Sequence, residues 1–342
     1  MRPEQQPIPA PDRFSKLRNE IKDGATYTWF ELTSPIVRLG AENVIRNTAV
    51  EYEEGFDEEI KAARKREDII VFVTNHQSLS DTVVCLKPLR RIKKLLGGLK
   101  VALPYTKLLT TGDKGASVKG FSDTMDQTLR EDEVESVLIV REQDEEIGVE
   151  ANYTDARKEL KQRVSQGYDI LIHAEGKLDA SRRNEEGERN GMQPFLENSL
   201  RSVMLIARDL KKQVTIIPMT ISGTYNIHDP ALGEIDPKTG QTRGTLTRNA
   251  MRVGLNFSDK SLARIFVSKS MRTCEGELGE IMRNDRHNWD RFNAVIGRKI
   301  ASHLPKRMQG VYASDETFAA ALEKLKIERE NARLEKLRFK QL

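Results

Sequence analysis

Residues 69–81 read IIVFVTNHQSLSD, an apolar run followed by a polar segment that contains a histidine and an aspartate. A short, continuous apolar run rich in β-branched residues predicts a strand that is buried on both faces. Strands of this kind belong to parallel sheets covered by helices on both sides. The polar residues that follow are therefore expected at the carboxyl end of the strand, where open α/β sheets bind their ligands.

Further apolar runs alternate with helical segments along the chain. Additional strands are expected at 100–103, 137–140, 170–173, 214–221, 252–257 and 265–268. Helices are expected at 153–166, at 199–212 and from about 275 to 303, before Pro305. This alternation predicts an α/β fold with a mixed, largely parallel central sheet flanked by helices.

The 342 residues divide into three predicted parts. Residues 1–65 comprise a start rich in Pro and Gln, which is expected to be disordered, and a smaller N-terminal helical subdomain. Residues 66–305 form the α/β domain, and residues 306–342 form a charged C-terminal helix. That helix is expected to begin at Ser314, because a serine followed by two acidic residues is a typical helix start.

Composition excludes several classes of protein. The net charge of +4 is too small to indicate a nucleic-acid partner, and two cysteines cannot build a disulfide framework. Few cysteines favour a reducing cytoplasm. No apolar run approaches the roughly 20 residues of a membrane span, and the first residues lack the apolar segment of a secretory signal. We expect a soluble or peripheral membrane protein without a transmembrane segment.

His76 and Asp81 are the candidate catalytic residues. Five positions apart on one regular helix, they would point roughly 140° apart, so they meet only if the chain turns between them. With His76 in a loop and Asp81 in a first helical turn, capped by Ser78 or Ser80, Asp81 accepts the Nδ1 proton of His76. The Nε2 atom of His76 is then free to take a proton from an alcohol. The spacing alone leaves open that the pair has no chemical role. The histidines and cysteines have no zinc-ligand spacing.

The segment Asn75–Asp81 resembles the NHxxxxD block of the glycerolipid acyltransferases. Three further blocks of that family have counterparts in the expected order, at Val137–Arg141, Ile170–Lys177 and Ile216–Ser222. The resemblance covers roughly residues 66–260. The long stretch between the second and third blocks, together with the absence of apolar spans, is most similar to the soluble glycerol-3-phosphate acyltransferases of plastid type. The expected location is the cytoplasm, or a compartment similar to the plastid stroma.

This resemblance implies an enzyme of phospholipid biosynthesis. It would move a fatty acyl group from an acyl carrier protein (ACP) or coenzyme A thioester to a hydroxyl of glycerol-3-phosphate, with His76 as general base oriented by Asp81. The reaction needs no metal, no cofactor beyond the thioester co-substrate and no covalent enzyme intermediate. The substrate-binding residues that the resemblance implies, several of them for the acceptor phosphate, are Arg141, Glu175, Gly176, Lys177 and Arg182. For Glu175 the alternatives are that it orders the turn or forms a buried salt bridge.

The third block departs from the family pattern. Ala174 stands where many relatives have proline, and Lys177-Leu178-Asp179 stands where they have a turn that contains an arginine. These departures leave the acceptor open, with lysophosphatidate or another alcohol as alternatives. They also leave open a catalytically inactive module that binds lipid or a carrier protein.

Residues 86–100 carry six Lys and Arg and no acid. A short amphipathic helix is expected, with Pro88 in its first turn, Gly97-Gly98 as its end and Leu89, Ile92, Leu95 and Leu96 on one face. Its charges could dock an acidic carrier protein or an anionic membrane surface, or could simply be solvated. Cys85, just before this segment, is expected to be a small buried residue rather than a nucleophile.

Overall fold

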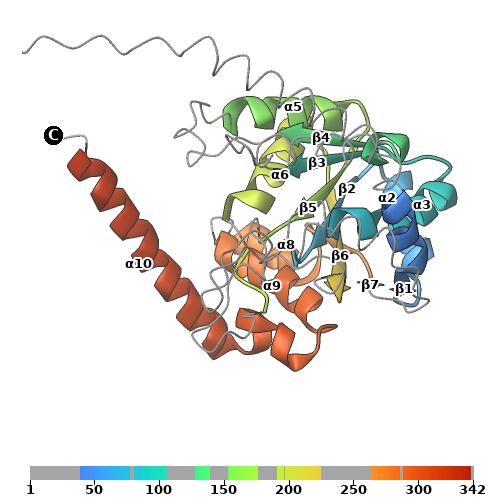
Figure 1. The fold of residues 1–342 in the computed structure, drawn as a ribbon. Coiled ribbons are helices and arrows are strands. Elements are labelled where there is room, and N and C mark those ends of the chain that lie inside the picture. The colour runs from blue at the N-terminus through green and yellow to red at the C-terminus, as the bar shows by residue number, and fades with distance from the viewer. Residues whose placement is uncertain are drawn as a thin grey trace, which may run out of the picture.

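The computed structural model describes residues 39–77, 81–105, 128–138, 153–175, 191–195, 197–224, 263–285 and 288–339. Within these residues the chain forms one mixed sheet of eight strands with helices on both faces, as Figure 1 shows. The predicted α/β fold class is therefore confirmed. None of the described helices is both long and apolar enough to cross a membrane.

The sheet is parallel over most of its width. Its strands are β1 (Ala49–Tyr52), β2 (Ile69–Thr74), β3 (Val101–Tyr105), β4 (Val134–Leu138), β5 (Asp169–His173), β6 (Val214–Ser222), β7 (Arg264–Val267) and β8 (Met271–Arg272). Across the sheet the order is β1-β7-β6-β2-β5-β3-β4, with β8 beside β6. Only β7 and β8 run antiparallel to β6 among the described pairings, so β2 lies at the centre of a parallel block.

Helices cover the sheet on both sides. The covering helices are α2 (Phe56–Lys65), α3 (Asp81–Leu96), α5 (Tyr153–Ser165), α6 (Glu197–Leu210), α8 (Gly276–Asn284) and α9 (Trp289–Ala301). The short 3-10 turns η4 (Lys306–Met308) and η5 (Gly310–Ala313) and the C-terminal helix α10 (Asp315–Phe339) follow. Residues 39–47 are helical as well. Because successive strand residues point to opposite faces, the continuous apolar strands supply two separate cores.

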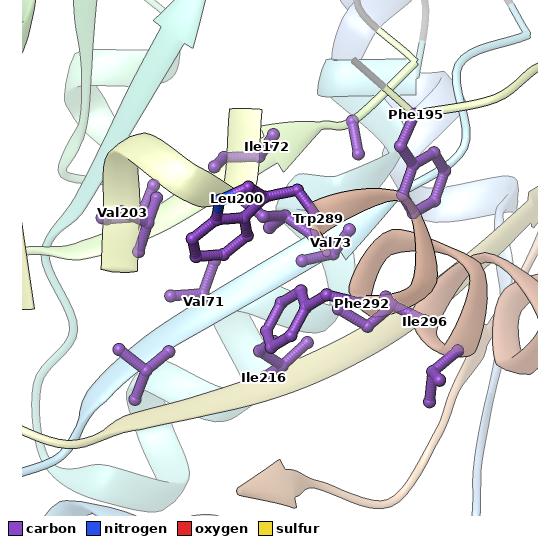
Figure 2. Close-up of a cluster of buried hydrophobic side chains, with 14 of the residues drawn as sticks. Val71, Val73, Ile172, Phe195, Leu200, Val203, Ile216, Trp289, Phe292 and Ile296 are labelled. Carbon is purple, nitrogen blue, oxygen red and sulfur yellow. The ribbon is translucent and has the colours of Figure 1, made fainter. Parts of the chain in front are cut away.

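On β2, for example, Ile70 and Phe72 pack with α2 and α3, whereas Val71 and Val73 pack with α6 and α9. Figure 2 shows this second core, in which Val71, Val73, Ile172 and Ile216 of the sheet meet Phe195, Leu200, Val203, Trp289, Phe292 and Ile296. Each large apolar side chain buried in this way contributes about 1.5–3 kcal/mol.

The two central strands send the chain to opposite faces of the sheet. Helix α3, which follows β2, belongs to the first core, and α6, which follows the neighbouring parallel strand β5, belongs to the second. In open α/β sheets, ligands bind outside the carboxyl ends of strands at such a divergence. His76 follows this end of β2.

Most predicted elements are confirmed to within a few residues. The strand expected at 137–140 begins earlier, at Val134, and residues 252–257 lie outside the described part of the chain. The single helix expected from 275 to 303 is wrong, because the chain breaks into α8 and α9. Asn288 caps the second helix, since its side chain accepts a hydrogen bond from Arg291 N at 3.0 Å.

The mostly helical pattern expected before residue 66 is wrong at Ala49–Tyr52, which forms the edge strand β1 and pairs with β7. Val50 and Tyr52 pack against the core while Glu51 is exposed, which is the period of two of a half-buried strand. Strand β1 is therefore part of the central sheet, and α2 is one of the helices that cover it. The part of the N-terminal segment before residue 39 lies outside the described residues.

The C-terminal helix begins as predicted, with Ser314 Oγ accepting a hydrogen bond from Thr317 N at 3.2 Å. The ring of Phe318 stacks on the ring of Tyr312, with centroids 5.3 Å apart. Helix α10 then extends away from the sheet (Figure 1). Just before this helix, the backbone passes close to residues 191–195. Val311 N donates to Met192 O at 3.0 Å, and Met192 N donates to Met308 O at 3.2 Å.

Gly310 makes this close approach possible, so Gly310→Ala is expected to lower the free energy of unfolding by about 3 kcal/mol or more. An added Cβ would overlap the backbone of Met192, and φ is +56°. The matched control is Gly276→Ala, where φ is +54° but a Cβ meets open space. It is expected to lose only about 1 kcal/mol. Urea unfolding measures both, and equal losses would contradict the proposed close packing.

Candidate active site

The carboxyl ends of three neighbouring parallel strands meet at one edge of the sheet. Asn75, His76 and Gln77 follow β2, Ala174 and Glu175 follow β5, and Thr224 follows β6 shortly after Ser222. Thr74, the last residue of β2, pairs in register with His173 on one side and Met219 on the other. Side chains from three distant parts of the sequence are thereby brought to one place.

The predicted contact between His76 and Asp81 is present. Nδ1 of His76 lies 3.0 Å from Oδ2 of Asp81, which is the first residue of α3. The Asp81 side chain is fully buried, whereas the His76 side chain keeps 18% of its surface exposed. Among the described residues, no hydrogen-bond partner of Nε2 is seen. Ser78 and Ser80, the predicted caps, lie outside the described residues.

Asp81 is held by more than His76. Gln77 N donates to the same oxygen as His76, and Thr224 Oγ1 donates to the other oxygen. A buried carboxylate is stable only with such charge-assisted hydrogen bonds, and the amino end of a helix favours its negative charge. The carboxylate is therefore fixed in both position and orientation, and it fixes the side of the His76 ring that it contacts.

The backbone on either side of His76 is tied to both neighbouring strands. The amide of Asn75 exchanges two hydrogen bonds with the backbone of Ile221 in β6, at 2.9 Å and 2.8 Å. The carboxylate of Glu175 accepts from His76 N at 3.1 Å and from Gln193 N at 2.9 Å. The turn-ordering alternative for Glu175 matches these contacts, and its part in substrate binding stays a prediction.

His173 is a site residue that the sequence analysis missed. Its ring stacks on the ring of His76, with centroids 4.5 Å apart and planes 15° from parallel. Its Nδ1 lies 2.6 Å from Thr74 Oγ1, and its Nε2 lies 3.0 Å from Thr82 Oγ1 in the first turn of α3. The sequence signal for His173 was its position at the end of a predicted strand, whereas the pairing of that strand with β2 is known only from the structure.

The environment keeps the His173 ring neutral. Removal from water and the nearby His76 lower the pKa of His173 to about 3, against a smaller opposite effect of the Asp81 carboxylate. Burial likewise raises the pKa of the Cys85 thiol well above its usual value, with a contribution from Asp81. Cys85 is fully buried, as predicted, and is kept as an uncharged thiol.

The predicted substrate-binding residues Arg141, Gly176, Lys177 and Arg182 lie outside the described residues. Their role with an acceptor phosphate stays a prediction. Within the described residues, no group of three or more histidine, cysteine, aspartate or glutamate side chains is arranged to hold a metal ion.

Residues 86–96 of the basic segment belong to α3, which starts at Asp81, so placing Pro88 in a first turn was wrong. The leucine face is confirmed, with Leu89 and Ile92 buried and Leu95 and Leu96 packed on the core. The helix ends at Leu96, where Gly97 adopts a φ of +70°.

Much of the positive charge of this helix is paired inside the protein. Arg90 binds both Glu42 and Asp132, Arg91 binds Asp57, and Lys93 binds Glu133. Lys87 Nζ donates to two backbone carbonyl groups. These contacts reduce the charge that this helix presents to a partner, and a carrier-protein or membrane contact through it stays a prediction.

Comparison with known proteins adds no identification. No protein-family model matches the chain, and no curated protein matches it. The fold and the site define an α/β protein with a histidine–aspartate pair at the carboxyl ends of its central strands, and its activity is inferred from that site.

Stability is expected to fall in acid because of His173. Its pKa drops from 6.5 in the unfolded chain to about 3 in the fold, so below pH 6.5 the unfolded chain binds the proton first and stability is lost. Between pH 7 and pH 4, the stability of the parent relative to His173→Phe should fall by about 3 kcal/mol. Urea unfolding at several pH values measures this difference. Parallel pH curves for the two proteins would show that His173 titrates normally in the fold.

Proposed function

We propose that this protein is an acyltransferase that moves a fatty acyl group from an ACP or coenzyme A thioester to the hydroxyl of glycerol-3-phosphate. The observation that carries the proposal is the contact between His76 Nδ1 and the buried carboxylate of Asp81, which directs Nδ1 to the carboxylate and leaves Nε2 as the nitrogen that can act as a base. The order of sequence blocks that resemble the glycerolipid acyltransferases supplies the reaction class.

In the proposed reaction, Nε2 of His76 takes the proton of the acceptor hydroxyl as the oxygen attacks the thioester carbonyl carbon. Asp81 holds the proton on Nδ1 and stabilises the imidazolium that forms. When the tetrahedral intermediate collapses, the carbon–sulfur bond breaks and the leaving thiolate takes the proton from His76. The products are an ester and a free thiol, and the enzyme returns to its starting state.

This mechanism asks for a base and for positive charge, and it uses no protein nucleophile. Cys85 is not expected to act as a nucleophile, because it is buried and its raised pKa keeps it as a thiol. The phosphate of the acceptor is assigned to Arg141, Lys177 and Arg182, since guanidinium and ammonium groups bind phosphate well. We place the protein in a reducing compartment, a cytoplasm or a plastid stroma, in keeping with its two free cysteines.

The test is release of free thiol from palmitoyl-ACP and palmitoyl-coenzyme A, with and without glycerol-3-phosphate. His76→Ala is expected to lower the acceptor-dependent rate by about 10³-fold or more, because it removes the base. The matched control is His303→Ala, which removes another stacked histidine, one that lies against Phe266 at 3.8 Å. This control is expected to keep the rate of the parent.

Acceptor-dependent release that survives His76→Ala would contradict the mechanism. Release that requires lysophosphatidate instead of glycerol-3-phosphate would keep the mechanism and change the acceptor. No release with either donor and either acceptor, from a folded protein that still binds acyl carrier protein or lipid, would favour the binding module.

A further inference from the structure

We propose that His173 is a positioning residue for His76, which holds the ring of the base at the angle that proton transfer requires. This inference rests on the proposed function, because it gives His173 a part in that reaction. His173 does not contact the acceptor in this account and acts through the His76 ring alone.

Among the described residues, the other contacts of His76 do not fix its ring completely. Asp81 holds Nδ1, and Glu175 holds the backbone N–H. The ring turns about two bonds, Cα–Cβ and Cβ–Cγ, whereas one hydrogen bond at Nδ1 fixes one distance, so a combined rotation about both bonds still swings Nε2 away from the acceptor. General-base catalysis needs Nε2 within hydrogen-bond reach of the hydroxyl, so this rotation lowers the rate. A flat surface against the face of the ring blocks it.

His173 is built to be that surface. Its ring lies nearly parallel to His76 at 4.5 Å, and both of its nitrogens are held by threonine hydroxyl groups. These hydroxyls come from the end of β2 and from the first turn of α3, which are the two elements that carry His76 and Asp81. The same two elements therefore hold both rings. The backbone beside His173 is held as well, because Ala174 N donates to Thr74 O at 3.1 Å.

The charge of the pair fits the same role. In the proposed reaction His76 becomes an imidazolium, and a second cation against its face would oppose that step. The pKa of His173 is lowered to about 3, so its ring is neutral when His76 takes the proton. The groups that act on His173 are His76, which disfavours its protonation, and Asp81 and the backbone of Asn75, which favour it. A neutral aromatic face next to a cation is a favourable arrangement.

Three substitutions test whether His173 holds the ring of His76 or only fills the space beside it. His173→Leu removes the flat surface, His173→Phe keeps a flat ring without the threonine hydrogen bonds, and Thr82→Val removes one hydroxyl while keeping the shape of the side chain. The Leu variant is expected to lower kcat about 10- to 100-fold with little change in KM. The Phe variant should retain kcat to within about 5-fold, and the Val variant should lie between the parent and the Leu variant. His303→Leu, at the other stacked histidine, is the control and should keep the parent kcat.

A double-mutant cycle tests whether His173 acts through His76. In the His76→Ala background, His173→Leu is expected to cause no further loss of thiol release, because the ring that it positions is gone. A loss of the same size in both backgrounds would overturn the proposal, and so would a Phe variant as poor as the Leu variant. Circular dichroism and urea unfolding establish that each variant is folded.

A second measurement does not depend on activity. NMR relaxation of the His76 ring is expected to show a rigid ring in the parent and a more mobile ring in His173→Leu, with the proton on Nδ1 in both because Asp81 is unchanged. An equally rigid His76 ring in that variant would overturn the positioning role. If the ring becomes mobile as expected but no thioester is turned over, the proposed function fails while the holding of His76 by His173 stands.

Discussion

The buried carboxylate of Asp81 is the constraint on which the rest of the site depends. A charge without solvent access must be satisfied by hydrogen bonds, and this one receives them from the His76 ring, from Gln77 N and from the Thr224 hydroxyl. These donors come from the loop after β2 and from the end of β6, so the carboxylate can be satisfied only when the parallel sheet is correctly formed. Folding of the sheet and orientation of the candidate base are in this way one event.

Hydrogen bonds also connect His76 to the C-terminal part of the chain. Glu175 joins the backbone of His76 to Gln193, and the neighbouring residues Met192 and Phe195 hydrogen-bond to the segment from Met308 to Tyr312. The tight approach at Gly310 therefore supports the segment that contacts Glu175, which in turn supports His76. A region that carries none of the candidate chemistry helps to hold the base in place.

The sequence predicts some of these features better than others, for physical reasons. The central strands are continuous apolar runs because both of their faces are buried, so β2, β5 and β6 were readily predicted. The edge strand β1 is short and carries a charge. The break between α8 and α9 depends on two local features within a continuous helical pattern: the non-helical backbone of Asp285 and the cap formed by Asn288.

Within the site, His76 and Asp81 were predictable because a single short loop joins them. His173 and Thr224 reach the same place through strand order and register, which one sequence does not reveal. The role of the buried carboxylate is tested most directly by Asp81→Asn, which keeps the size of the side chain and removes its charge. The account predicts a folded protein whose acceptor-dependent thiol release falls about 10²- to 10⁴-fold. A folded Asp81→Asn protein that releases thiol at the parent rate would contradict it.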